Sequence, residues 1–158
     1  MYKLKLVDSL GRECLETCGV TKKTWNEINN LSFTYITSRD LRKKLLNIFC
    51  DNGFIKRMYI HPEHRIFITA EKSKIGISIL FAHYAQFYFE LAKLVYLKNT
   101  KKINKATIIL PSIKLQDALM KKGNLATHEK ISKQMSLFTN QYDIELNILY
   151  LDIKKIEK

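Results

Sequence analysis

The chain has 158 residues, enough for one domain that buries a single hydrophobic core without disulfides or a structural metal. It carries 27 Lys and Arg against 15 Asp and Glu, a formal net charge of +12, which favours a polyanionic partner such as nucleic acid. The excess of lysine, with only 5 Gly and 2 Pro, is also what an AT-rich coding sequence produces. No stretch of the sequence is long and apolar enough to span a membrane.

The remaining compositional signals indicate an intracellular protein. The first residues lack the apolar core of a signal peptide, so we expect a cytoplasmic location. Cys14, Cys18 and Cys50 are odd in number and form no CxxC pair. We therefore expect free thiols, no metal site and no cofactor.

Residues 1–36 are the least regular part of the chain. They combine an alternating apolar start in residues 2–6 with a helical pattern from Lys22 to about Leu31 that holds the single tryptophan, Trp25. We expect them to form an N-terminal cap region of one domain spanning 1–158.

A basic amphipathic helix is predicted next, over residues 39–50. Thr37 and Ser38 are its N-cap candidates, Asp40 lies in its first turn, and Gly53 follows its end. Its apolar face carries Leu41, Leu45, Ile48 and Phe49, and its opposite face carries Arg39, Arg42, Lys43 and Lys44. That opposite face is either a solvated surface or a contact surface for DNA.

The rest of the chain alternates strands and helices. Apolar runs predict strands at 54–60, 65–69 and 75–80, then helix 83–98, strand 106–110, helices 113–122 and 128–139, and a last strand at 144–153. This order predicts a single α/β domain, a mixed five- or six-stranded sheet with helix 83–98 on one face and helix 39–50 on the other.

Helix 83–98 is apolar nearly all round, with Glu90 and Lys93 as its only charges before its end. Such a helix needs cover on more than one side.

The sequence pattern of residues 76–151 resembles that of the BamHI/BglII/BstYI type of restriction endonuclease, a branch of the PD-(D/E)xK nuclease fold. In that family a strand reading roughly E-x-(E/Q)-F-G-N enters a helix with K-L near its middle, followed by a strand ending in proline. Here the same places read Ser78-Ile79-Leu80-Phe81-Ala82-His83, then Lys93-Leu94, then Ala106 to Pro111. The resemblance covers about half of the chain and implies a restriction-endonuclease-like fold.

The family's metal-binding acids are missing from this sequence. By the resemblance, the upstream Asp falls on His61 and the two strand positions on Ser78 and Leu80, and none of these supplies a carboxylate. Hard cations such as Mg²⁺ need carboxylate oxygens, so the resemblance implies a pseudoenzyme in which cleavage is lost.

Two other chemistries stay open. Glu63 and Glu71 are fallback acids for an active nuclease with a migrated site, and His61, His64 and His83 would suit Zn²⁺ if they converged. Glu90, Asp117 and Glu129 are interpreted as solvated or helix N-terminal charges.

The sequence thus predicts a catalytically inactive nuclease-fold protein that binds double-stranded DNA as a regulator or accessory factor, encoded by a phage or another mobile element. Loss of acids removes repulsion of phosphates. The expected DNA contacts are Arg39, Arg42, Lys43, Lys44, Lys56, Arg57, Lys72 and Lys74.

The alternative is a protein–protein adaptor or inhibitor acting on a host or defence protein. A homodimer is also expected, because the resembled nucleases bind palindromes as two-fold dimers. The stripe of Ile131, Met135 and Phe138 on helix 128–139 is the predicted dimer surface, although it would equally pack onto the sheet of one chain.

Overall fold

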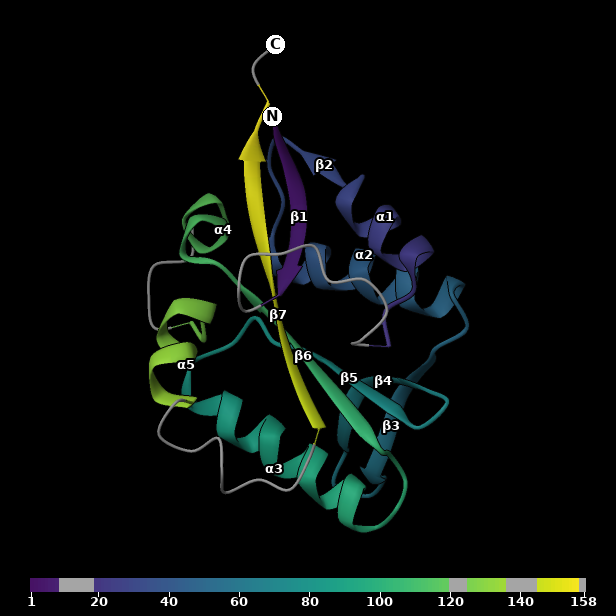
Figure 1. Ribbon diagram of the computed structural model, residues 1–158. Coiled ribbons are helices and arrows are strands. Elements are labelled where there is room, and N and C mark those ends of the chain that lie inside the picture. The colour runs from purple at the N-terminus through teal and green to yellow at the C-terminus, as the bar shows by residue number, and fades with distance from the viewer. Residues whose placement is uncertain (9–18, 120–124, 136–144, 157–158) are drawn as a thin grey trace.

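A computed structural model of the chain describes residues 1–8, 19–119, 125–135 and 145–156, and its strands form one mixed sheet (Figure 1). The strand order is β2-β1-β7-β6-β5-β4-β3. Strands β5, β6 and β7 run parallel and the other pairs are antiparallel. The bounds are β1 Tyr2–Asp8, β2 Ser32–Phe33, β3 Ile55–His61, β4 Ile66–Lys72, β5 Ile75–Ile79, β6 Lys105–Pro111 and β7 Glu145–Lys155. The predicted single α/β domain is confirmed, with seven strands in the described residues rather than five or six.

Helices cover both faces of this sheet. They are α1 Lys22–Asn29, α2 Ser38–Asp51, α3 Ala85–Asn99, α4 Ile113–Ala118 and α5 His128–Met135. Helices α1, α2 and α4 share one buried core with the sheet, and α3 and α5 share the other. The predicted placement of the two main helices on opposite faces is therefore confirmed. Among the described residues, no helix combines the length and apolarity needed to cross a membrane.

The N-terminal residues contribute more than a cap. Strand β1 pairs with β7 in an antiparallel register from Tyr2↔Lys155 to Asp8↔Leu149, and Leu4 and Leu6 are buried. The two strands run side by side through the centre of Figure 1. Local alternation predicted an extended segment here, but its partner lies at the far end of the sequence and no local pattern names it.

Helix α2 forms where its capping signals predicted. The Thr37 hydroxyl accepts a hydrogen bond from the Asp40 amide at 3.1 Å and donates one to the Asp40 carboxylate at 2.6 Å. Leu41, Leu45 and Phe49 are fully buried against the sheet, each stabilising the fold by about 1.5–3 kcal/mol. The basic face of α2 is consequently left on the outside.

The sheet opens where β4 parts from β5. Their backbone pairing stops at Ala70↔Ile77. Beyond this pair, the Thr69 hydroxyl accepts a hydrogen bond of 3.0 Å from the Ile79 amide. A side chain thus replaces the missing backbone partner, because a buried amide must be satisfied.

Candidate nucleic-acid interface

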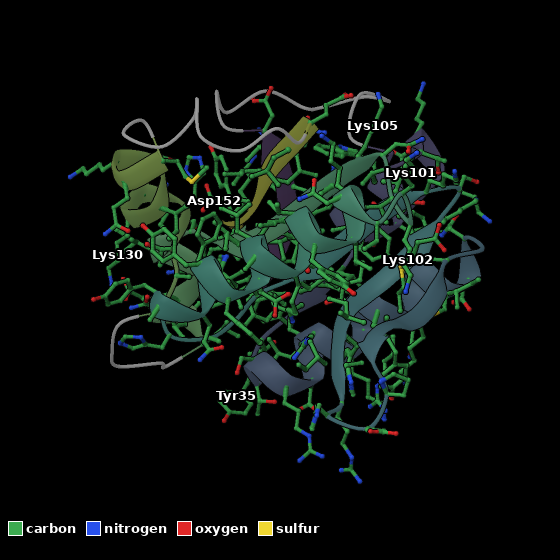
Figure 2. All side chains as sticks on the ribbon, turned by 90° about the horizontal axis from the view of Figure 1, so that it is seen from below. Tyr35, Lys101, Lys102, Lys105, Lys130 and Asp152 are labelled. Carbon is green, nitrogen blue, oxygen red and sulfur yellow. The ribbon has the colours of Figure 1, made fainter. Side chains whose placement is uncertain are left out.

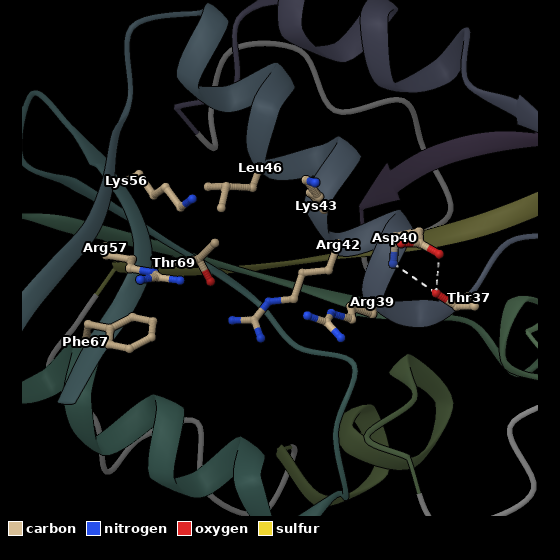
Figure 3. A pocket seen from close by; sticks show the side chains of 10 residues that line it. All are labelled: Thr37, Arg39, Asp40, Arg42, Lys43, Leu46, Lys56, Arg57, Phe67 and Thr69. Atoms are coloured by element: carbon tan, nitrogen blue, oxygen red, sulfur yellow. Dashed lines mark hydrogen bonds between the residues drawn. The ribbon is translucent and has the colours of Figure 1, made fainter. Parts of the chain in front are cut away.

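A basic cleft lies between the start of α2 and strands β3 and β4 (Figure 3). Its volume is about 710 Å³. Arg39 and Arg42 project from α2 into the open space, and Arg57 and Phe67 face them from the strands. The lining residues are Thr37, Arg39, Asp40, Arg42, Lys43, Leu46, Lys56, Arg57, Phe67 and Thr69.

The charge of the basic cleft is strongly positive. Five of its lining residues are cations, and its single carboxylate, Asp40, is bonded to the Thr37 hydroxyl at the N-cap. The N-terminus of α2 adds the positive end of a helix dipole. Phosphate groups are the anions that such an arrangement suits best.

Arg57 is held in an unusual backbone conformation. Its φ of 56° lies in the left-handed region, which costs a non-glycine residue about 1 kcal/mol or more. The Arg57 guanidinium carbon stands 5.5 Å from the centre of the Phe67 ring, a cation–π distance, and Tyr59 contacts the same ring with centroids 5.4 Å apart. Strain and stacking together orient this guanidinium at the cleft wall.

The structure gathers five of the eight predicted DNA contacts, Arg39, Arg42, Lys43, Lys56 and Arg57, in the basic cleft. Lys44 is exposed on the same helix but does not line the cleft.

The other two predicted contacts have different surroundings. Lys72 donates to the Asn52 carbonyl at 2.7 Å, beyond the end of α2, and Lys74 is exposed at the β4–β5 turn. Positive charge also occurs elsewhere, since Figure 2 shows Lys101 and Lys105 on the opposite side of the view from Tyr35.

A buried polar cluster lies on β5 and α3, near the cleft. The hydroxyl of Ser78 donates to the Glu90 carboxylate at 2.8 Å, and Lys93 forms an ion pair with the same carboxylate. The Lys93 ammonium also donates to the Phe67 carbonyl at 2.8 Å. Lys93 is only 9% exposed.

The interpretation of Glu90 as a solvated charge is therefore wrong. A carboxylate and an ammonium three residues apart on an otherwise uncharged helix were the only sequence signal for this pair.

The structure shows the surroundings of the residues that the resemblance placed at metal-binding positions, and of the two fallback acids. Leu80 is buried in the core beneath α3, and His61 is exposed with its ring stacked on His64 at 4.4 Å. Glu63 is exposed in the β3–β4 turn. Glu71 lies at the other end of β4, where its carboxylate accepts a hydrogen bond of 2.7 Å from the Lys74 amide. The two fallback acids are thus about 20 Å apart, the length of a seven-residue strand.

No metal-ligand cluster is present in the described part of the chain. No three of its His, Cys, Asp and Glu side chains are placed to hold an ion. The His83 ring contacts the Tyr84 ring at a tilt, with centroids 4.6 Å apart, rather than joining His61 and His64. The three histidines considered for Zn²⁺ are not brought together.

The two described residues of the predicted dimer stripe, both on α5, are not on the surface. Ile131 and Met135 are buried in the core that α5 shares with α3, so they are committed to packing within one chain. Phe138 lies outside the described residues. Ile131 and Met135 therefore follow the alternative given for this stripe, which is packing within one chain.

Comparison with known proteins gives a fold but no close relative. No family model matches the sequence, and no curated protein matches it. Among solved structures, the restriction endonuclease BglII complexed with a DNA 16-mer superposes with a TM-score of 0.60 at 12% identity over 75% of this chain. The fold is that of a restriction endonuclease.

The similarity to BglII extends along the chain. Free BglII superposes with a TM-score of 0.54 at 9% identity, covering 100% of this chain and 82% of BglII. In the match to the DNA complex, the chain spans 57% of the length of BglII. The restriction-endonuclease-like fold expected from residues 76–151 is confirmed.

Proposed function

We propose that this protein binds double-stranded DNA through the basic cleft without cleaving it, acting as a regulator or accessory factor of a phage or mobile element. The observation that carries the proposal is the convergence of five cations from α2 and β3 on one cleft with a single, internally bonded acid. The fold shared with BglII, which was solved with a DNA 16-mer, supports the choice of DNA.

The proposal predicts a steep salt dependence. If the five cations each contact a phosphate, log–log plots of affinity against salt have a slope of about −4.5. Raising the salt from about 50 to about 200 mM then weakens binding several hundred-fold. Fluorescence anisotropy with a labelled random duplex measures this slope, and a slope near zero would contradict the proposal.

Neighbouring lysines on α2 provide a matched pair of variants. Lys43 lines the cleft and Lys44 does not, although both are exposed. Lys43→Gln should reduce the magnitude of the salt slope by about 0.9, the contribution of one phosphate contact. Lys44→Gln should leave it unchanged, and equal effects would place the DNA outside the cleft.

The absence of cleavage rests on the acids near the cleft. In the described residues, Asp40 is bonded to Thr37, and Glu90 is paired with Lys93. Neither presents a free carboxylate to a divalent ion. Supercoiled plasmid incubated with Mg²⁺ or Mn²⁺ should stay intact, and nicking that Glu90→Gln abolishes would establish an active nuclease.

A homodimer is proposed through a different helix from the one the sequence indicated. Ala85, Phe89, Ala92 and Tyr96 form one exposed, uncharged stripe along α3, with Phe89 51% and Tyr96 50% exposed. Under a two-fold axis at the middle of α3, Phe89 faces Ala92 of a second copy and Ala85 faces Tyr96. Large side chains thus oppose small ones, as an isologous interface requires.

Sedimentation tests the dimer. Tyr96→Glu should convert the dimer to an 18.6 kDa monomer, because a charge in an apolar interface is left unpaired. Tyr35→Glu, at an exposed aromatic away from α3, is the control. A wild-type monomer at high concentration would reject the dimer and favour the adaptor alternative, in which the stripe binds another protein.

A further inference from the structure

A second hollow adjoins the basic cleft. It has a volume of about 420 Å³ and shares Arg42, Phe67 and Thr69 with the cleft. Its other walls come from the β3–β4 turn, β4 and α3: His64, Arg65, Ile66, Phe89, Glu90 and Lys93. None of the residues predicted from the sequence as DNA contacts lines it except Arg42.

Lys93 gives this second hollow a fixed ammonium group. Two of its three N–H bonds are directed to Glu90 and to the Phe67 carbonyl, and the Phe89 ring lies 5.2 Å away. The third N–H has no partner among the described residues. Because the side chain is already immobilised, an anion that accepts this hydrogen bond does so with little further loss of entropy.

The charge of the second hollow matches a dianion. Arg42, Arg65 and Lys93 supply three positive charges, and Glu90 supplies one negative charge. The surplus is two positive charges, whereas an internal phosphodiester of DNA carries one negative charge. A phosphomonoester carries close to two negative charges at neutral pH, because its second pKa is about 6.

We propose that the second hollow binds the terminal phosphomonoester of a nucleic-acid strand, with the Lys93 ammonium and the Arg42 and Arg65 guanidinium groups as donors. The adjoining basic cleft then holds the backbone that follows this end. This inference rests on the proposed DNA binding and adds to it a preference for phosphorylated ends.

The test compares short duplexes ending in 5′-phosphate, 3′-phosphate or hydroxyl groups, using fluorescence anisotropy. We expect one phosphorylated end to bind about tenfold more tightly than the hydroxyl end, the size of one hydrogen bond between charged groups. The 5′ and 3′ arms identify which end is recognised. Equal affinity for all three duplexes overturns the inference but leaves the proposed DNA binding intact, whereas no binding to any duplex refutes the proposed function itself.

Variants separate the second hollow from general attraction. Arg65→Gln, at an exposed position, should abolish the preference for phosphorylated ends. Arg39→Gln, in the basic cleft only, should weaken binding to all duplexes and keep the preference.

The double variant Lys93→Met/Glu90→Gln removes both buried charges together, so it leaves no unpaired ion to unfold the protein. It should also lose the preference for phosphorylated ends. A preference that survives in both Arg65→Gln and the double variant overturns the inference.

Discussion

Replacing Lys93 by methionine should destabilise the protein by about 3–4 kcal/mol. The change removes the counter-ion of Glu90 and the donor to the Phe67 carbonyl. Removing one partner of a buried ion pair costs about 3–5 kcal/mol, because the other charge stays buried without compensation. The Lys93 and Glu90 side chains are 10% and 17% exposed. This residual exposure places the expected loss of stability near the lower end of that range.

Equilibrium unfolding in urea measures this loss directly. For a domain of this size the same loss lowers the melting temperature by roughly 10 °C. The double variant Lys93→Met/Glu90→Gln should recover to within about 1.5 kcal/mol of the wild type, because a neutral amide can still accept the Ser78 hydroxyl. The double-mutant cycle therefore yields a large coupling energy.

A surface ion pair supplies the control. Lys23 and Glu27 are 3.8 Å apart with side chains 70% and 37% exposed, and Lys23→Met should cost less than about 0.5 kcal/mol. If Lys93→Met costs as little as Lys23→Met, then the ammonium is not held in a low-dielectric site. The fixed donor proposed for the second hollow would then be refuted with it.

Three further predictions concern α2, the cleft wall and α5. Thr37→Ala removes the N-cap acceptor of α2 and should destabilise the protein by about 1 kcal/mol in thermal melts, whereas Ser38→Ala should cost less. Arg57→Gly relieves a left-handed backbone, so DNA affinity should fall while the midpoint of urea unfolding does not. Burial lowers the pKa of His128 from 6.5, partly offset by Glu129, so unfolded chains bind the proton first and stability falls as the pH drops below about 6.5. His128→Gln should flatten that part of the stability curve, and an unchanged curve would show that another group is responsible.

The sequence by itself determined the local elements and much of the basic cleft. Thr37 and Asp40 marked the start of α2, and the 3.6-residue spacing of its apolar side chains fixed which face is buried and which is basic. The apolar runs at β5 and β6 on either side of α3 predicted the order strand, helix, strand. They also carried the resemblance to restriction endonucleases, and the similarity to BglII supports that fold. These features depend on residues close together in the chain, so their signals are visible in it.

Only the tertiary structure decided how these elements meet. The pairing of β1 with β7 and the hydrogen bond from the Lys93 ammonium to the Phe67 carbonyl join residues far apart in the sequence. The sequence left two roles open for the stripe that includes Ile131 and Met135, a dimer surface or packing within one chain, and the structure buries both residues in the core. Periodicity shows that a face is apolar and does not show what covers it, because burial is a property of the packed domain and not of the segment.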